Sequence, residues 1–152
     1  MKLSHTVKLL GVHLSSDLKW STHINVCSKV SKRLFALRIL KRNGAVQKDL
    51  RNVYCSFIRP VLEYACPVWH FSLAAFLSDQ MEQIQRGSVK MICPGLSYMD
   101  GLKELNFSTP VDHREFLCKK FYVNSLSSSS NISDLLPKKT LHLYNFRNDS
   151  AF

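Results

Sequence analysis

The chain contains 152 residues, enough for one domain with a single hydrophobic core, and its 45% of apolar and 21% of charged residues are ordinary for a globular protein. No apolar run approaches the roughly 20 residues that span a bilayer, and the first residues lack the apolar stretch of a signal peptide, which argues against a membrane or secreted protein. The net charge of +10 is high and favours an anionic partner, nucleic acid before membrane, over a surface that is merely solvated.

The N-terminal segment predicts a short strand. In the stretch Thr6 to Leu14, Leu10, Val12 and Leu14 alternate with Gly11 and His13. No second convincing strand follows, so we expect an unpaired edge or a pairing with residues 141–146. A turn signal at 15–17 closes this part, which we take as residues 1–20.

The first predicted helix begins near Ser21 or Thr22 and ends at Asn43–Gly44. Apolar residues recur on one of its faces at helical spacing: Val26, Cys27, Val30, Leu34 and Leu37. Between His23 and Arg42 there are six Lys or Arg residues and no Asp or Glu. A helix of this composition is a candidate for binding phosphates, although a solvated face would look similar. The candidate nucleic-acid-binding residues are Lys29, Lys32, Arg33, Arg38, Lys41 and Arg42.

The most apolar passage of the chain, YCSFIRPVLEYACPVWH, runs from Tyr54 to His70. It predicts a central helix that begins near Val46 and ends at Cys66–Pro67, with Pro60 starting a new turn or kinking the helix. We expect the apolar face of this helix to form the core, with the Phe57 ring fully buried. That face comprises Leu50, Val53, Tyr54, Phe57, Ile58, Val61, Leu62 and Ala65.

Three more helices are predicted after the central one. The first covers residues 73–91, and the second follows the capping signal Ser97-x-x-Asp100 to about residue 105. The third begins at Thr109-Pro110 and runs to about residue 125. Its expected buried residues are Phe116, Leu117, Phe121 and Val123. The predicted fold is therefore mainly α, a small bundle of four to five helices with one short N-terminal β-strand. Residues 21–126 form the helical domain, and 127–152 form a Ser-rich linker and basic tail.

Several ordered segments resemble one known family. SFIRPVLEYACPVW, LSDQMEQIQRGSVKMI and PGLSYMDGLKEL are similar to the region after the catalytic palm in reverse transcriptases of non-LTR (LINE-type, jockey-like) retrotransposons. KLLGVHLSSDLKWSTHI resembles the palm-to-thumb junction of that family, and LYNFRND resembles the tail after its thumb. The resemblance extends from Lys8 to Asn148. It implies a thumb domain, which grips template and primer behind the active site in full-length relatives.

Catalytic machinery is not expected in this chain. The resembling family uses an Asp-Asp pair to hold two metal ions, and no Asp-Asp pair occurs here. The seven Asp residues are scattered: Asp17, Asp49, Asp79, Asp100, Asp112, Asp134 and Asp149. The five cysteines form no C-x-x-C pair, so we expect reduced thiols in an intracellular protein, nuclear or cytoplasmic, with no metal and no cofactor.

These observations predict a non-catalytic remnant of a reverse transcriptase thumb that binds the backbone of RNA, DNA or an RNA–DNA hybrid without sequence specificity. An alternative is an inert relic or protein–protein module that associates with itself through the surface that faced the palm. A weaker alternative rests on residues 7–33, which are similar to a helical N-terminal piece of AlkB-like tRNA-modifying dioxygenase and methyltransferase proteins. Those dioxygenases bind iron through two His and one carboxylate.

Overall fold

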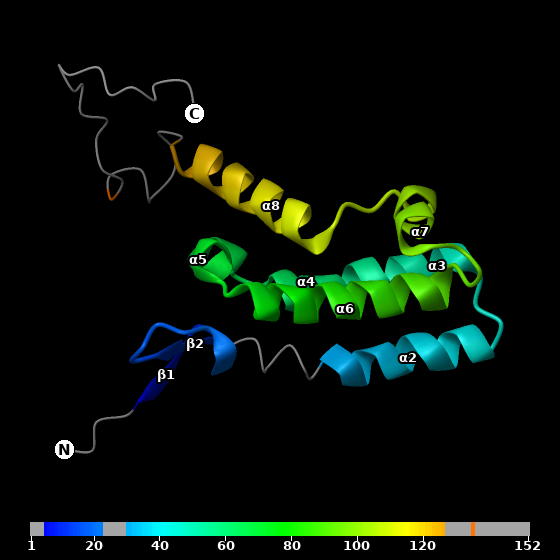
Figure 1. The fold of residues 1–152 in the computed structure, drawn as a ribbon, viewed down its shortest axis with the longest axis horizontal. Helices are drawn as coiled ribbons and strands as arrows, with labels where there is room; N and C mark the ends of the chain where they lie inside the picture. Colours follow the sequence, from blue (N-terminus) through cyan, green and yellow to red (C-terminus); the bar gives the residue numbers. More distant parts are fainter. Residues whose placement is uncertain (1–4, 23–29, 127–134, 136–152) are drawn as a thin grey trace. The chain divides into compact units, whose positions relative to one another are not determined.

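The computed structural model of the chain describes residues 5–22, 30–126 and 135. Over these residues the fold is mainly helical, as the sequence predicts, with a small antiparallel sheet near the N-terminus (Figure 1). The described residues up to Lys119 form one compact unit, and those from Lys120 onward belong to a second. The hydrophobic core lies in the first unit.

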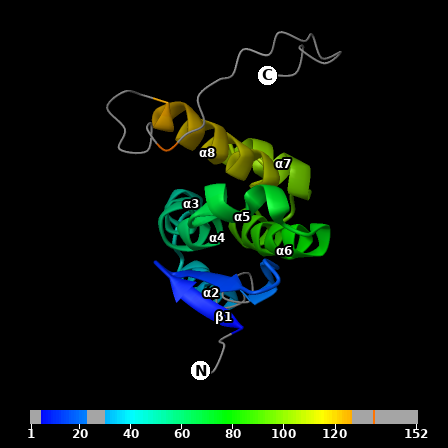
Figure 2. The same cartoon turned by 90° about the vertical axis from the view of Figure 1, so that its left-hand side faces the viewer.

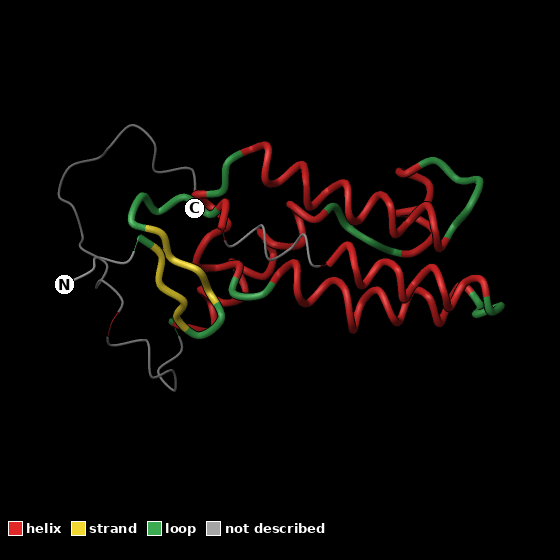
Figure 3. The backbone as a smooth tube through the Cα atoms, turned by 90° about the horizontal axis from the view of Figure 1, so that it is seen from below, coloured by secondary structure: helices red, strands yellow, loops and turns green. Residues whose placement is uncertain are grey.

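The predicted single strand proves to be a hairpin of two strands, β1 (Thr6–Leu9) and β2 (Val12–Ser15), drawn in yellow in Figure 3. Leu10 and Gly11 form the turn with φ of 46° and 84°, and a type I′ hairpin turn requires positive φ at both of its central residues. The sequence has Leu-Gly here instead of the usual Asn-Gly signal of such a turn. Because leucine seldom adopts a positive φ, the sequence does not predict the turn. The Tyr64 hydroxyl donates to the Leu10 carbonyl at 2.7 Å and ties the turn to the helical part.

Three helices pack against one another at the centre of the first unit: α2 (Val30–Arg42), α3 (Gln47–Val53) and α6 (Ala75–Ile92) (Figures 1 and 2). The inner face of α2 buries Val30 and Leu37 completely, as predicted. The helix ends where the sequence indicates, at Asn43–Gly44, because Gly44 takes a φ of 81° that residues with a side chain avoid.

The central stretch continues from α3 into a π-helical turn, η1 (Tyr54–Ile58), and then into α4 (Arg59–Glu63). The Arg59 N–H donates to the Tyr54 carbonyl, five residues back. This widened turn lies immediately before Pro60, which has no N–H to donate and whose ring would collide with a carbonyl of a regular α-helical turn. Pro60 therefore starts a new helical segment, one of the two outcomes that the sequence allows.

The widened turn also changes which residues face the core. The buried residues of this stretch recur at every fourth position: Leu50, Tyr54, Ile58 and Leu62. Phe57 lies outside that row and is 45% exposed, so the prediction that its ring is fully buried was wrong. An α-helical wheel places Phe57 on the apolar face, whereas the extra residue per turn in the π segment rotates it towards solvent.

The central helix ends earlier than predicted, at Glu63. Ala65 takes a left-handed conformation with a φ of 55°, and a separate short helix, α5 (Cys66–Trp69), begins after it. Pro67 thus lies in the first turn of a helix, a position that proline tolerates, instead of ending one. The 3-10 turn η2 (His70–Ser72) follows, and the Trp69 ring is completely buried.

Two glycines at the helices α6 and α7 (Tyr98–Leu105) have opposite environments. A Cβ atom on Gly87 would meet nothing within 4 Å, so this glycine is simply tolerated. A Cβ atom on Gly101 would lie 2.4 Å from Cγ1 of Val89. Glycine at position 101 therefore permits the close packing of α7 against α6.

The starts of α7 and α8 (Pro110–Ser125) are set by local capping, as predicted. The Ser97 and Thr109 hydroxyls each accept the backbone N–H three residues on, at 3.2 Å in both cases. The predicted burial along α8 was largely wrong, because three of its expected core residues are about half or more exposed: Phe116 at 58%, Phe121 at 48% and Val123 at 64%. Arg114 and Cys118 are buried instead.

The predicted Ser-rich linker and basic tail fall outside the described residues, except for Leu135. The expected pairing of residues 141–146 with the N-terminal strand falls outside them as well.

Candidate nucleic-acid interface

The solvent-facing side of α2 carries a continuous row of exposed side chains. Lys32, Phe35, Arg38 and Arg42 follow one another at intervals of three, three and four residues and are all exposed. Side chains at these intervals lie on one face of a helix, and the row spans about 15 Å at a rise of 1.5 Å per residue. We call these four residues the basic stripe.

The remaining sequence-predicted cations divide into two groups. Arg33 and Lys41 contact the protein itself: Arg33 Nη1 donates to the Phe57 carbonyl at 2.6 Å, and Lys41 Nζ donates to the carbonyl of Met91. The Arg33 guanidinium also lies 4.4 Å from the centre of the Phe57 ring. Lys29 lies outside the described residues. The predicted set of six is therefore not one free surface, because two of its cations hold α2 against neighbouring segments.

Phe35 is the residue of this surface that sequence reasoning missed. Its side chain is 59% exposed, and it stands between Lys32 and Arg38 on the stripe. The signal was available, since Phe35 is offset from the inner row of Val30 and Leu37 and shares the spacing of the cations.

The charges of the basic stripe are uncompensated within the part of the chain that the structure describes. The described part of α2 has no acidic residue in its first turn and ends on Lys41 and Arg42. The ion pairs among the described residues all lie outside α2. Positive potential therefore persists along the stripe, except where salt screens it.

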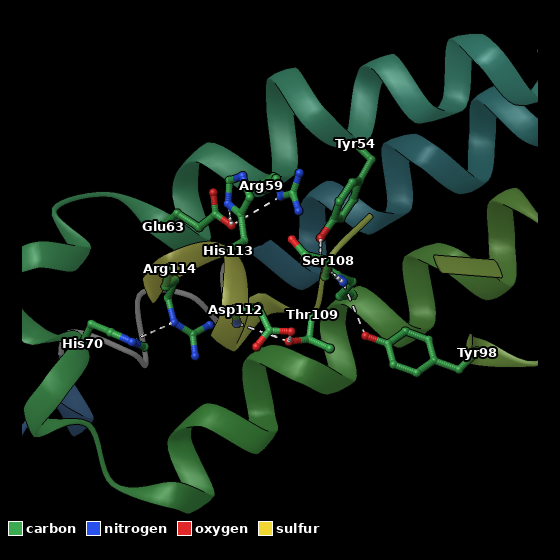
Figure 4. Close-up of polar contacts among 11 residues, drawn as sticks. Tyr54, Arg59, Glu63, His70, Tyr98, Ser108, Thr109, Asp112, His113 and Arg114 are labelled. Carbon is green, nitrogen blue, oxygen red and sulfur yellow. Dashed lines mark hydrogen bonds and ion pairs between the residues drawn. The ribbon is translucent and has the colours of Figure 1, made fainter. Parts of the chain in front are cut away.

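A second polar cluster lies inside the first unit, and Figure 4 shows it in close-up. Glu63, 10% exposed, has two partners: it forms an ion pair with Arg59, whose Nε lies 3.3 Å from its Oε1, and His113 Nδ1 lies 2.8 Å from the same oxygen. The Arg59 guanidinium also lies 5.1 Å from the centre of the Phe107 ring. Through these contacts the Glu63 carboxylate joins α4 to the first turn of α8, so its role is structural.

Arg114 is 1% exposed, although nothing in the sequence marks it as a core residue. Its Nε donates to His70 Nδ1 at 3.4 Å (Figure 4). Its Nη2 donates to Ser78 Oγ at 3.0 Å. Burial lowers the pKa of His70, and the nearby Arg114 cation lowers this pKa further, while Glu115 opposes the shift. Since His70 must accept at Nδ1, its neutral form fits this contact.

The buried Gln85 side chain, 1% exposed, connects α6 to three other segments. It accepts from the Tyr54 hydroxyl at 2.8 Å and donates to the Ser108 carbonyl at 2.9 Å and to the Tyr98 hydroxyl at 3.3 Å. Tyr98 in turn donates to Glu82. Burial raises the pKa of both tyrosines well above the usual value, so their hydroxyls stay protonated and serve as donors.

The described residues offer no assembled catalytic group. Burial raises the pKa of the Cys66 thiol to about 12, and it also raises that of Cys118, which makes both poor nucleophiles. His113 and Glu115 have the His-x-Glu spacing of an iron-binding pair, but His113 contacts Glu63, and Glu115 pairs with Lys119 at 2.8 Å. Within the described ranges, no three His, Cys, Asp or Glu side chains gather as metal ligands would.

Four aspartates of the first unit occupy helix starts or solvent-exposed positions. Asp100 and Asp112 lie at helix starts, and Asp49 and Asp79 are exposed.

In the described part of the chain, no helix is both apolar enough and long enough to cross a membrane.

Comparison of the chain with protein-family models, with curated proteins and with solved structures finds no match. The functional assignment therefore depends on the geometry of this chain.

Proposed function

We propose that the protein binds the sugar–phosphate backbone of nucleic acid, without sequence specificity, through the exposed face of α2. The observation that carries this proposal is the basic stripe, where Lys32, Arg38 and Arg42 are exposed with no acidic partner among the described residues. Cations in such a row neutralise phosphates and release counterions, which is the main source of affinity that does not depend on base sequence.

The structure also limits how much of the net charge is available for binding. Three arginines lie over aromatic rings: Arg33 over Phe57 at 4.4 Å, Arg51 over Phe107 at 5.4 Å and Arg114 over Trp69 at 5.8 Å. Arg51 Nε also donates to the carbonyl of Leu105 at 2.9 Å. These cations stabilise the fold, so the exposed cations of α2 are the better candidates for phosphate contacts.

The resemblance to the thumb of non-LTR reverse transcriptases agrees with a binding role that is separate from catalysis. We infer that the chain is a non-catalytic relative of that thumb, with RNA, DNA or a hybrid as the partner. An intracellular location, nuclear or cytoplasmic, belongs to the same proposal, because nucleic acid is the partner.

Two matched triple variants test this proposal. Lys32, Arg38 and Arg42 are changed together to Gln, and a control variant changes Lys8, Lys48 and Lys103 to Gln. Both remove the same charge from exposed positions, but the control removes it from three separate elements. We expect the α2 variant to lose affinity for single strands and duplexes of any sequence and the control to retain most of it. Equal losses in the two variants would show that only net charge matters and would reject α2 as the interface.

One observation favours self-association as a second candidate function. Large apolar side chains near α5 and in the hairpin turn are exposed: Tyr64 at 52%, Val68 at 57%, Phe71 at 77% and Leu10 at 84%. Exposed apolar surface of this kind promotes association. Sedimentation of the purified protein over a range of concentrations tests this candidate, which predicts oligomers that dissociate on dilution, whereas a monomer at all concentrations contradicts it.

A further inference from the structure

We propose that the α2 surface prefers single-stranded nucleic acid, because the exposed Phe35 ring stacks on a base while the flanking cations hold the phosphates. This inference rests on the proposed function and deepens it. The surface would bind any base, since every base has an aromatic face on which a ring can stack.

The position of Phe35 is the first argument. The ring is 59% exposed, which leaves more than half of a large apolar side chain in water, whereas Val30 and Leu37 on the inner face of the same helix are completely buried. Arg33, by contrast, covers a nearby ring, that of Phe57, at 4.4 Å. No ring contact among the described residues engages Phe35. The ring is therefore open to a partner.

The charges around the ring are the second argument. Lys32 precedes Phe35 by one helical turn, and Arg38 and Arg42 follow it along the same face. A strand that follows this face would place its phosphates against cations on both sides of the ring. Aromatic side chains between cations along a groove or face are how single-strand binders hold both parts of a nucleotide.

The preference for single strands follows from the accessibility of the base faces. In a duplex the base faces are stacked on their neighbours, so an exposed ring on a helix surface meets only edges and backbone. In a single strand the faces can open and accept the ring. The cations serve both forms equally, and the ring adds affinity only for the single strand.

A basic face with one aromatic residue can also meet an anionic lipid surface, but the composition of α2 argues against that partner. A helix that lies on a membrane directs an entire apolar face into the lipid. The inner residues Val30, Leu34 and Leu37 of α2 pack in the protein core, which leaves Phe35 as the ring of the exposed stripe. A single ring among three cations suits stacking on a base better than insertion of an apolar helix face into a membrane.

The test compares three ligands of equal length by fluorescence anisotropy: a single strand with bases, an abasic single strand and a duplex. The variants are Phe35→Ala and Phe76→Ala. Phe76 is a matched control, because it is also 59% exposed on a helix, α6, but has no Lys or Arg within one turn. Both rings are exposed, so thermal unfolding of the two variants should match that of the wild type.

We expect Phe35→Ala to weaken binding of the base-containing strand by about 5- to 150-fold, the effect of losing one stacked base. Binding of the abasic strand and the duplex should change by less than about twofold, and Phe76→Ala should change none of the three. Equal effects of Phe35→Ala on base-containing and abasic strands would overturn the stacking inference and leave the proposed function intact.

Two further outcomes separate the hypotheses. If the triple Gln variant of the stripe binds all three ligands as the wild type does, the proposed function itself fails. If Phe35→Ala instead abolishes binding to vesicles of anionic phospholipid and leaves oligonucleotide binding unchanged, the partner is a membrane surface and the inference is rejected.

Discussion

Replacing Gly101 with Ala should destabilise the protein, whereas the same replacement at Gly87 should stabilise it. Both glycines are helical, so each substitution gains the same helix propensity, roughly 1 kcal/mol. At Gly101 the added Cβ would lie 2.4 Å from Val89 Cγ1, a distance that real Cβ contacts do not reach, while at Gly87 it meets nothing within 4 Å. Overpacking of this kind costs about 1–3 kcal/mol.

The difference between the two variants isolates the clash, because the propensity gain cancels. Gly87→Ala should raise the free energy of unfolding by about 0.5–1 kcal/mol, and Gly101→Ala should fall below Gly87→Ala by about 1–3 kcal/mol. Combining Gly101→Ala with Val89→Ala removes the atom that the new methyl group meets. That double variant should recover stability relative to Val89→Ala alone.

Urea denaturation followed by far-ultraviolet circular dichroism measures these differences, provided that the slope m stays constant among the variants. Equal stabilisation by Gly101→Ala and Gly87→Ala would refute the close packing of α7 on α6. So would a double variant that is merely additive, because residues in contact must couple.

Three more predictions concern the core, the partly buried His70 and the carboxylates. Ile58→Ala should cost about 2–5 kcal/mol, since Ile58 is completely buried, whereas Phe57→Ala should cost less than about 2 kcal/mol; equal costs in urea denaturation would contradict the π-turn register. Because the pKa of His70 is lowered in the fold, the unfolded chain binds the proton more readily, so stability should fall as pH drops below the ordinary value of 6.5. His70→Gln should flatten this pH dependence of the unfolding midpoint, and an unchanged profile would disprove the role of His70. Primer extension with magnesium or manganese should show no incorporation, and incorporation that disappears when Asp79 and Glu82 are both changed to Ala would overturn the non-catalytic assignment.

The parts of the fold that local chemistry determines were predictable from the sequence. Ser97 and Thr109 predict where their helices begin, because a capping hydroxyl accepts the backbone N–H group three residues further on. Gly44 likewise marks a helix end through its own backbone conformation. Each of these signals depends only on residues within one helical turn of one another.

The parts that depend on distant residues were not predictable. Arg114 is buried through Ser78 and His70, which lie 36 and 44 residues away, and a charged side chain gives no sequence signal for such a position. Phe57 was misplaced because a single π turn shifts the helical phase, and Leu10 was taken for a strand residue because leucine seldom forms a hairpin turn. The candidate interface was half predictable: the sequence locates its helix, and only packing separates Arg33 and Lys41 from the exposed stripe.

The salt dependence of binding tests the central claim most directly. With three exposed cations on the stripe, the slope of log affinity against log salt for a duplex should be steeper for the wild type than for the Lys32, Arg38 and Arg42 triple Gln variant by about 2.7, or ~0.9 per phosphate contact. If four of the six cations that the sequence indicates neutralise phosphates, the total slope for a duplex is about −3.6. Equal slopes for wild type and variant would contradict the assignment of α2 as the surface that binds nucleic acid.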